Sequence, residues 1–313
     1  MQVFRSLSAL QRVTRTEAHG CVATIGAYDG LHRGHQAIIA EVRDRARALG
    51  VPSVVFSFEP LPREYFGGDD PPGRLTRFRE RVELMRSLGV ERFFCARFDD
   101  AMRCIDTREF IEQMLVDGVR PRCVVVGDDF RFARQRAGTV ADLRTAGTRH
   151  GFDVVQVCSV YVDGDRVSSS AIREALARGE FARAARMLGR PWTMRGRVRP
   201  GRRLGRTLGF PTANVDPGRR RCPVSGIFAV RVLGIDDSAR EAVASVGTRP
   251  TVDGGGAPLL EVHVFDFDGD LYGRLIEVEF VARLRDELKF DSLEALTEQM
   301  HRDCDAARRI FAA

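Results

Sequence analysis

The hydrophobic period of this chain changes once, near Gly189-Arg190-Pro191-Trp192, and that change constrains the fold more than any other feature. Before it, apolar runs of strand length alternate with segments whose apolar residues recur at helical spacing. After it, to about residue 282, short alternating runs are separated by Gly, Pro and Asp. We therefore predict two domains, residues 1–189 and 190–313, each long enough to bury a core of its own.

The first half predicts an α/β domain. Alternating strands and helices are typical of a parallel, Rossmann-like sheet with helices on its faces and a ligand site at the carboxyl ends of its strands. The expected strands are Cys21–Ile25, Ser53–Phe58, Arg92–Phe98, Cys123–Val126 and Val154–Val160.

The second half predicts an antiparallel barrel or sandwich, closed by a C-terminal helix. The expected strands are Ile227–Leu233, Ala242–Val246, Leu260–Phe265 and Ile276–Phe280. The helix carries one apolar stripe, which predicts packing against the β-structure. The stripe consists of Leu293, Leu296, Met300, Cys304, Ala307 and Phe311.

Composition narrows the class of protein. We see no apolar run of the ~18–20 residues that a membrane-spanning helix needs and no secretory segment. The seven cysteines are scattered and never spaced as C-x-x-C, so we expect reduced thiols in a cytoplasmic protein, without disulfides or a zinc site.

The net charge of +6 suits nucleotides and equally suits weak nucleic-acid binding. Lys289 is the only lysine, so arginine is the background cation, and no basic stripe interleaved with aromatic residues predicts a nucleic-acid partner.

The segment Thr24–His35 runs from the first expected strand, through an Asp-Gly turn, into a helix. Such a turn lets backbone N–H groups approach a phosphate closely. His32 and His35 could donate hydrogen bonds to phosphoryl oxygens as charge develops during phosphoryl or nucleotidyl transfer. An isolated H-x-G-H is as often a pair of solvent-facing histidines, but the strand, turn and helix around it favour a nucleotide site.

Two further segments follow strands of the same expected sheet. Gly127–Phe132 follows the fourth strand, and Ser168-Ser169-Ser170 follows the fifth and opens a helix. Serines at a helix start are caps by default, yet they also offer hydroxyl and N–H groups to a phosphate, which Arg173 could reach as well. Each segment is weak evidence alone, whereas three on one edge of a sheet favour a binding site.

In the second half, Gly205-Arg206-Thr207-Leu208-Gly209-Phe210-Pro211-Thr212-Ala213-Asn214 is the sharpest motif. In an extended segment, the Thr212 hydroxyl and the Asn214 amide share one face. Together with the phosphates of a nucleotide, these oxygens suit Mg²⁺. Gly205 and Arg206 can pass close to the phosphates. The alternative is a polar turn between strands.

Glu261 and His263 alternate with Leu260, Val262 and Val264, so the two polar residues share one face of a strand. A carboxylate facing the mouth of a barrel is a candidate general base for a hydroxyl group. A glutamate on a strand is otherwise simply solvated, and the neighbouring motif favours the base.

With both halves assembled, the chain closely resembles the bacterial bifunctional riboflavin kinase/FMN adenylyltransferases, or prokaryotic FAD synthetases, from about Cys21 to Phe311. The resemblance rests on the G-x-(F/Y)-D-G-x-H-x-G-H segment, the Phe58-Glu59-Pro60-x-Pro62-Arg63 loop, Gly127–Phe132, the serine-serine-x-x-Arg helix start, G-F-P-T-A-N and D-L-Y-G. It implies a nucleotidyltransferase domain that converts FMN to FAD with release of pyrophosphate. It also implies a riboflavin-kinase β-barrel that makes FMN from riboflavin and ATP.

The resemblance also implies roles for individual residues. Catalytic roles would fall to His32, His35, Arg173 and Glu261. ATP would be bound by Gly26, Asp29, Gly34, Ser169, Ser170, Gly205, Arg206, Thr212 and Asn214. The flavin would be bound by Phe58, Pro60, Arg63, Asp129, Phe130 and Arg285. Mg²⁺ would arrive with ATP and contact Thr212 and Asn214.

The chain departs from the family pattern at a few positions. Ala27 replaces a usual Asn or Ser, Leu61 a usual His, Ala133 a usual Gly, Ser170 a usual Thr, and Ser245 a common Asn. The first four leave open a riboflavin kinase with weakened or lost adenylyltransferase activity. A non-catalytic flavin- or nucleic-acid-binding regulator is a third interpretation, supported only by the basic charge.

Overall fold

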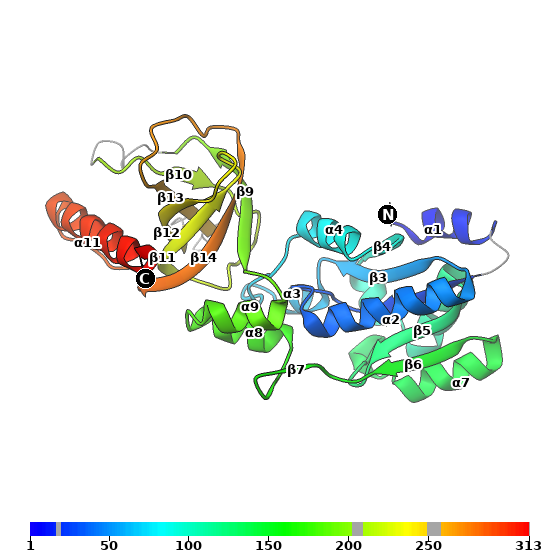
Figure 1. Ribbon diagram of the computed structural model, residues 1–313. Helices are drawn as coiled ribbons and strands as arrows, with labels where there is room; N and C mark the ends of the chain where they lie inside the picture. The colour runs from blue at the N-terminus through cyan, green and yellow to red at the C-terminus, as the bar shows by residue number, and fades with distance from the viewer. Residues whose placement is uncertain (17–19, 202–208, 249–257, 313) are drawn as a thin grey trace. The chain divides into compact units, whose positions relative to one another are not determined.

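The computed structural model describes residues 1–16, 20–201, 209–248 and 258–312, and their contacts divide the chain into two units. The N-terminal unit comprises Met1–Pro72 and Thr76–Ser168, and the C-terminal unit comprises Gly73–Leu75 and Ser169–Ala313. The boundary between the units thus lies at Ser169, ahead of the change of hydrophobic period near Gly189. Figure 1 shows the chain coloured from blue at its N-terminus to red at its C-terminus.

The N-terminal unit is built on a six-stranded sheet whose neighbouring strands are all parallel, in the order β1-β4-β3-β2-β5-β6. Its strands are β1 (Gln2–Phe4), β2 (Cys21–Ile25), β3 (Ser53–Glu59), β4 (Arg92–Arg97), β5 (Pro121–Gly127) and β6 (Asp153–Val157). The predicted parallel sheet is confirmed. Strand β1 was not predicted, because three residues are too short to show a period. Strand β6 ends at Val157, ahead of a small hairpin formed by β7 (Tyr161–Val162) and β8 (Asp165–Arg166).

Helices cover both faces of this sheet (Figure 1). Ala23 and Ile25 of β2 pack with the residues of α1, η1 and α7, whereas Val22 packs with α2 on the other face. Successive side chains of a strand point to opposite faces, so a sheet covered on both sides needs unbroken apolar strands. The segments that accompany the sheet are α1 (Leu7–Thr14), α2 (Arg33–Leu49), α3 (Pro62–Phe66), α4 (Phe78–Ser87), α5 (Asp100–Cys104), α6 (Thr107–Glu109), η1 (Phe110–Val119), η2 (Arg134–Arg136) and α7 (Val140–His150).

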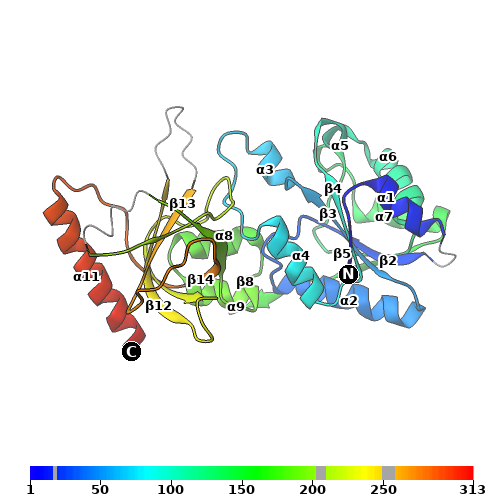
Figure 2. The ribbon, with the colours of Figure 1, turned by 90° about the horizontal axis from the view of Figure 1, so that it is seen from above.

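The C-terminal unit is a closed antiparallel barrel, which Figure 2 shows from above. Its strand order is β10-β13-β12-β11-β14-β9. Its strands are β9 (Thr193–Arg199), β10 (Ala213–Val215), β11 (Gly226–Leu233), β12 (Arg240–Thr248), β13 (Pro258–Val264) and β14 (Leu275–Arg285). The four predicted strands lie within or largely overlap β11 to β14. Closure decides for the barrel over the sandwich, since β9 pairs with both β10 and β14.

Among the described residues, three helices accompany the barrel: α8 (Ser169–Ala177), α9 (Phe181–Leu188) and α11 (Leu293–Ala312). The C-terminal half of α11 packs against the outside of the barrel, where Ala307 and Cys304 meet Ala229. The predicted apolar stripe is therefore a packing surface at this end. Its first residue, Leu293, is 52% exposed. Within the described ranges, no helix has the length and apolar character required to cross a bilayer.

Candidate functional site

The strand–turn–helix predicted around the two histidines is present. Strand β2 ends at Ile25, and α2 begins at Arg33 with His32 as its N-cap. In the turn, Tyr28 and Leu31 have left-handed backbones, with φ of 52° and 42°. Such conformations are costly for residues other than glycine and persist where surrounding contacts hold them. One such contact joins the buried Tyr28 hydroxyl to the Thr24 hydroxyl at 2.6 Å.

The two histidine rings stack at the start of α2. Their centroids lie 3.7 Å apart at an interplanar angle of 16°. The His35 N–H donates to Nδ1 of His32 over 3.3 Å, so a neutral His32 carries its proton on Nε2 and can donate from there. Gly34 leaves room for the His32 ring, because a Cβ at this residue would lie 3.3 Å from that ring, a tight contact.

His35 is electrically neutral at neutral pH. Burial lowers its pKa well below the ordinary value of a histidine, and the adjacent His32 lowers it further. Its Nδ1 is buried and has no hydrogen-bond partner among the described residues. The pair is therefore suited to donating hydrogen bonds to an anion, without a permanent charge on both rings.

Asp29 shapes this turn from inside the protein. Its Oδ1 accepts hydrogen bonds from the Thr76 N–H at 3.0 Å and from the Thr76 hydroxyl at 3.2 Å. The same hydroxyl accepts from the Gly30 N–H at 2.9 Å. Asp29 is only 3% exposed. Its direct contact with ATP stays a prediction.

The strand order brings the other predicted loops to the same edge of the sheet. Strand β2 lies between β3 and β5, so the loops that follow all three strands share the carboxyl edge of a parallel sheet. Phe58 lies at the end of β3 and contacts Phe98 edge-on. Pro60 and Arg63 follow it and are exposed.

The loop after β5 holds the remaining predicted flavin residues of this unit. Asp129 forms an ion pair with Arg166 at 2.6 Å, and Phe130 stacks with Phe132 at 5.6 Å. Ala133, where the family usually has glycine, has φ 62° and ψ −173°, a backbone region that strongly favours glycine.

Ser169, Ser170 and Arg173 lie in the first turns of α8, in the C-terminal unit. Arg173 donates from Nε to the Gly73 carbonyl at 2.6 Å. The chain leading to this helix passes beside the histidine turn, since the Val167 carbonyl lies 3.9 Å from where a Cβ on Gly34 would be. The contact of these residues with an ATP phosphate stays a prediction.

In the barrel, Asn214 of β10 stands directly opposite Glu261 of β13, which stands opposite Ser245 of β12. Residues opposed in this way share one face of the sheet. The other face is the barrel interior, which Leu260 and Val262 fill without any exposure. Glu261 therefore lies on the outer face of the barrel wall, and the expectation that it faces the barrel mouth is wrong.

The segment before β10 is held beside Glu261. The His263 ring nitrogen Nδ1 lies 2.9 Å from the Pro211 carbonyl and donates a hydrogen bond to it. Phe210 meets the rings of His263 and of His301 on α11 edge-on, at 5.3 and 4.8 Å. These contacts fix the approach of the chain to Thr212.

Two predicted ATP ligands, Gly205 and Arg206, lie outside the described residues. Gly201 precedes them and lies directly over Asn214, because a Cβ at Gly201 would come within 2.1 Å of the Asn214 Nδ2 atom. Arg285, at the end of β14, pairs with Asp303 of α11 through Nη2 at 2.6 Å and Nε at 2.9 Å. Its contact with flavin stays a prediction.

The donor set in the barrel suits a magnesium ion that arrives with a nucleotide. Among the described residues, no group of three or more His, Cys, Asp or Glu side chains could hold a metal. Thr212 and Asn214 offer neutral oxygens, one hydroxyl and one amide. Mg²⁺ is commonly bound by few protein oxygens together with the phosphates of a substrate, so these residues fit it.

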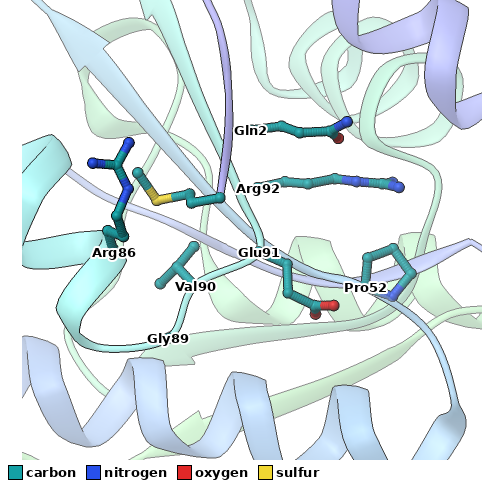
Figure 3. A pocket seen from close by; sticks show the side chains of 8 residues that line it. Gln2, Pro52, Arg86, Gly89, Val90, Glu91 and Arg92 are labelled. Carbon is teal, nitrogen blue, oxygen red and sulfur yellow. The ribbon is translucent and has the colours of Figure 1, made fainter.

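A cavity of about 460 Å³ lies at the opposite edge of the N-terminal sheet (Figure 3). Gln2, Pro52 and Arg92 line it, and they lie in β1 or at the amino-terminal ends of β3 and β4. Ligands of such sheets bind at the carboxyl ends, so this cavity is separate from the predicted site.

Sequence reasoning missed two residues that support the histidine turn, Thr76 and Arg81. Both act through contacts with residues more than 20 positions away. A single arginine carries little signal in a chain whose background cation is arginine, so only the fold identifies Arg81.

The comparisons with known proteins divide the chain in the same way as its motifs. The family model described as FAD synthetase matches residues 14–171. The family model described as riboflavin kinase matches residues 188–311.

Several relatives bear the name bifunctional riboflavin kinase/FMN adenylyltransferase. The protein of Pseudomonas fluorescens is 47% identical over 100% of this chain and 98% of its own length. That of Escherichia coli K12 is 42% identical over 97% of each chain. A crystal structure titled macrolide-efflux protein, from Streptococcus pneumoniae, has a TM-score of 0.79 and 28% identity over 98% of this chain and 99% of its own. This last match shows a shared fold along nearly the whole chain.

Proposed function

The chain belongs to the bifunctional riboflavin kinase/FMN adenylyltransferase family, and on that premise we propose that its two reactions occur at separate sites, one at the histidine turn and one at Glu261. The enzyme phosphorylates riboflavin with ATP to give FMN, and it transfers AMP from a second ATP to FMN to give FAD and pyrophosphate. One observation carries the proposal of two sites: the two family models match separate parts of the chain, one containing His32 and His35 and the other containing Glu261. The match to the FAD synthetase model also favours this function over a kinase alone.

In adenylyl transfer, a phosphate oxygen of FMN attacks the α-phosphorus of ATP, and the bond to the bridging oxygen of pyrophosphate breaks. This nucleophile is already ionised at neutral pH, so the step needs no general base. It needs stabilisation of the charge on the triphosphate and on the leaving pyrophosphate. His32, His35, Arg173 and the N-terminus of α2 would supply it, with Ser169 and Ser170 as further donors.

The kinase step has a different requirement, because a ribityl hydroxyl must lose its proton as it attacks the γ-phosphorus. Glu261 is the proposed general base. The Asn214 amide stands directly opposite it, which suits holding ATP and its metal ion beside the base. Mg²⁺, when bound with ATP, would neutralise charge on the phosphate oxygens.

The flavin contacts follow from the same assignment. Phe58, Pro60, Arg63, Asp129 and Phe130 would bind FMN in the N-terminal unit, where their loops follow the strands on either side of β2. Arg285 would contact the flavin of the kinase.

We also place the enzyme in the cytoplasm. All seven cysteines are free thiols, as a reducing compartment would keep them.

The test is analysis of the products formed from riboflavin, ATP and Mg²⁺. We expect FMN first and then FAD, and FAD should also form from supplied FMN. FMN as the sole product would overturn the adenylyl-transfer assignment. RNA retained on a filter at physiological salt, with neither product formed, would favour the regulator instead.

A further inference from the structure

Arg81 of α4 is a fully buried arginine, with 0% of its surface exposed. Removing a guanidinium from water is costly unless it is paired and hydrogen-bonded. The partners of a buried arginine therefore show which parts of the structure it holds together.

Among the described residues, the partners of Nη1 and Nη2 of Arg81 all lie at the ends of two neighbouring strands, whereas its buried Nε has no hydrogen-bond partner. Nη1 donates to the Ala27 carbonyl at 3.0 Å and to the Ser57 hydroxyl at 3.0 Å. Nη2 donates to the Phe58 carbonyl at 3.1 Å and to the Glu59 carboxylate at 2.5 Å. The Ser57 hydroxyl also donates to the Ala27 carbonyl at 3.1 Å, which closes the network.

Under the proposed function, the segments at these two strand ends bind different substrates. Ala27 lies after β2, in the turn that leads to His32 and precedes the left-handed Tyr28. Phe58 and Glu59 end β3 and begin the loop with Pro60 and Arg63, which we assign to FMN. One planar guanidinium thus contacts the backbone of both segments.

The geometry of the guanidinium makes this contact rigid. Its donors lie in one plane at fixed angles, so a carbonyl held by Nη1 and a carbonyl held by Nη2 keep a fixed separation. A lysine has one nitrogen at its tip, so it can bind one side of this network well but cannot reproduce the fork.

We infer that Arg81 is a positioning residue for adenylyl transfer, which sets the distance between the turn that binds ATP and the loop that binds FMN. The inference rests on the proposed function of the N-terminal unit. Because displacement of reacting groups by about 1 Å can cost on the order of 10²-fold in rate, loss of the fork should lower the rate at each intact site.

The test compares Arg81→Lys with Arg79→Lys in the full-length enzyme. Arg79 lies on the same helix and is exposed. For each protein, the kcat of FAD formation from FMN and ATP is divided by the number of FAD molecules bound per chain. FAD is the product of the adenylyl site, so its binding stoichiometry counts the folded sites.

We expect Arg81→Lys to bind nearly one FAD per chain and to lose roughly 10- to 10²-fold in kcat per site. Its kinase rate should remain unchanged, and Arg79→Lys should match the wild type. If kcat falls only in proportion to the FAD bound, Arg81 merely supports folding and the inference is overturned. A rate per site within twofold of the wild type overturns it too.

Ser57→Ala provides the second variant in case Arg81→Lys does not fold. It deletes one partner of Nη1 and the link to Ala27 while leaving the ion pair with Glu59. We expect a severalfold loss in kcat per site with full FAD binding, and an unchanged rate would overturn the inference. A wild-type enzyme that forms no FAD would instead overturn the proposed function itself.

Discussion

Asn214 and Glu261 face each other across the antiparallel pair of β10 and β13, on the outer side of the barrel wall. Antiparallel partners lie about 4.5–5.5 Å apart, so the amide proposed to bind ATP stands beside the carboxylate proposed as the general base. The pairing therefore gives a structural reason for the motif Pro211-Thr212-Ala213-Asn214 and for Glu261 to act in one reaction.

Replacing Glu261 by glutamine should remove most FMN formation. Gln cannot accept the hydroxyl proton, and loss of a positioned base costs about 10²- to 10⁴-fold. The rate of FAD formation from supplied FMN should stay unchanged in the same sample. Glu277→Gln, on strand β14 of the same barrel, is the matched control. A drop in kinase kcat of less than about tenfold would exclude the role.

The double substitution His32→Ala with His35→Ala should abolish FAD synthesis and spare FMN synthesis. It removes both stacked rings from the start of α2, and with them the donors proposed for the triphosphate. His150→Ala, at the exposed end of α7, is the control for a change of histidine elsewhere in this unit. Loss of kinase activity in a double variant that keeps its circular dichroism spectrum would show that the two sites are not separate.

Nucleotide-free enzyme should bind Mg²⁺ only weakly, because Thr212 and Asn214 offer neutral oxygens and most ligands would come from ATP and water. Isothermal calorimetry with MgCl₂ should show no tight site, and binding should appear once a non-hydrolysable ATP analogue is present. Tight binding of Mg²⁺ alone would contradict this expectation.

The stability of the N-terminal unit should fall as the pH falls below about 6.5, the pKa of an unfolded histidine. Burial lowers the pKa of His35 in the folded state, so below that pH the unfolded chain binds a proton that the folded chain does not. The contribution is full above the unfolded pKa and is lost as pH decreases, by at most about 1.4 kcal/mol per pH unit for one proton. Denaturant unfolding at several pH values checks this, and His35→Gln should flatten the slope. An equal slope in both proteins would disprove the assignment to His35.

Ala133→Gly should stabilise the N-terminal unit. Ala133 has φ 62° and ψ −173°, a conformation that costs a residue with a Cβ about 1–3 kcal/mol. The greater freedom of glycine in the unfolded chain offsets about 0.4–1 kcal/mol of the gain. The free energy of unfolding should therefore rise by about 1 kcal/mol. Ala137→Gly, where φ is −66°, should give no gain. Absence of any difference between the two variants would show that Ala133 is not strained.

Local patterns in the sequence determined the elements and the motifs of this protein. The apolar run of β2 and the Asp-Gly turn after it predict a strand, a turn and a helix with His32 at its start, and all three are present. The alternation of Leu260, Val262 and Val264 with polar residues correctly predicts that Glu261 and His263 share a face. Such features depend on neighbours within one turn or one strand, so they can be read from the order of residues.

The tertiary structure alone decided which distant residues meet. Register places Glu261 opposite Asn214 on the outer wall of the barrel. The alternation of apolar residues could not show whether the polar face of this strand lies at the mouth of the barrel or on its outer wall. The strand order β3-β2-β5 brings three loops to one edge. Arg81 becomes a bridge between Ala27 and Phe58 only once α4 packs on that sheet. Each of these relations depends on contacts between segments far apart in the chain, and a local pattern carries no information about such pairings.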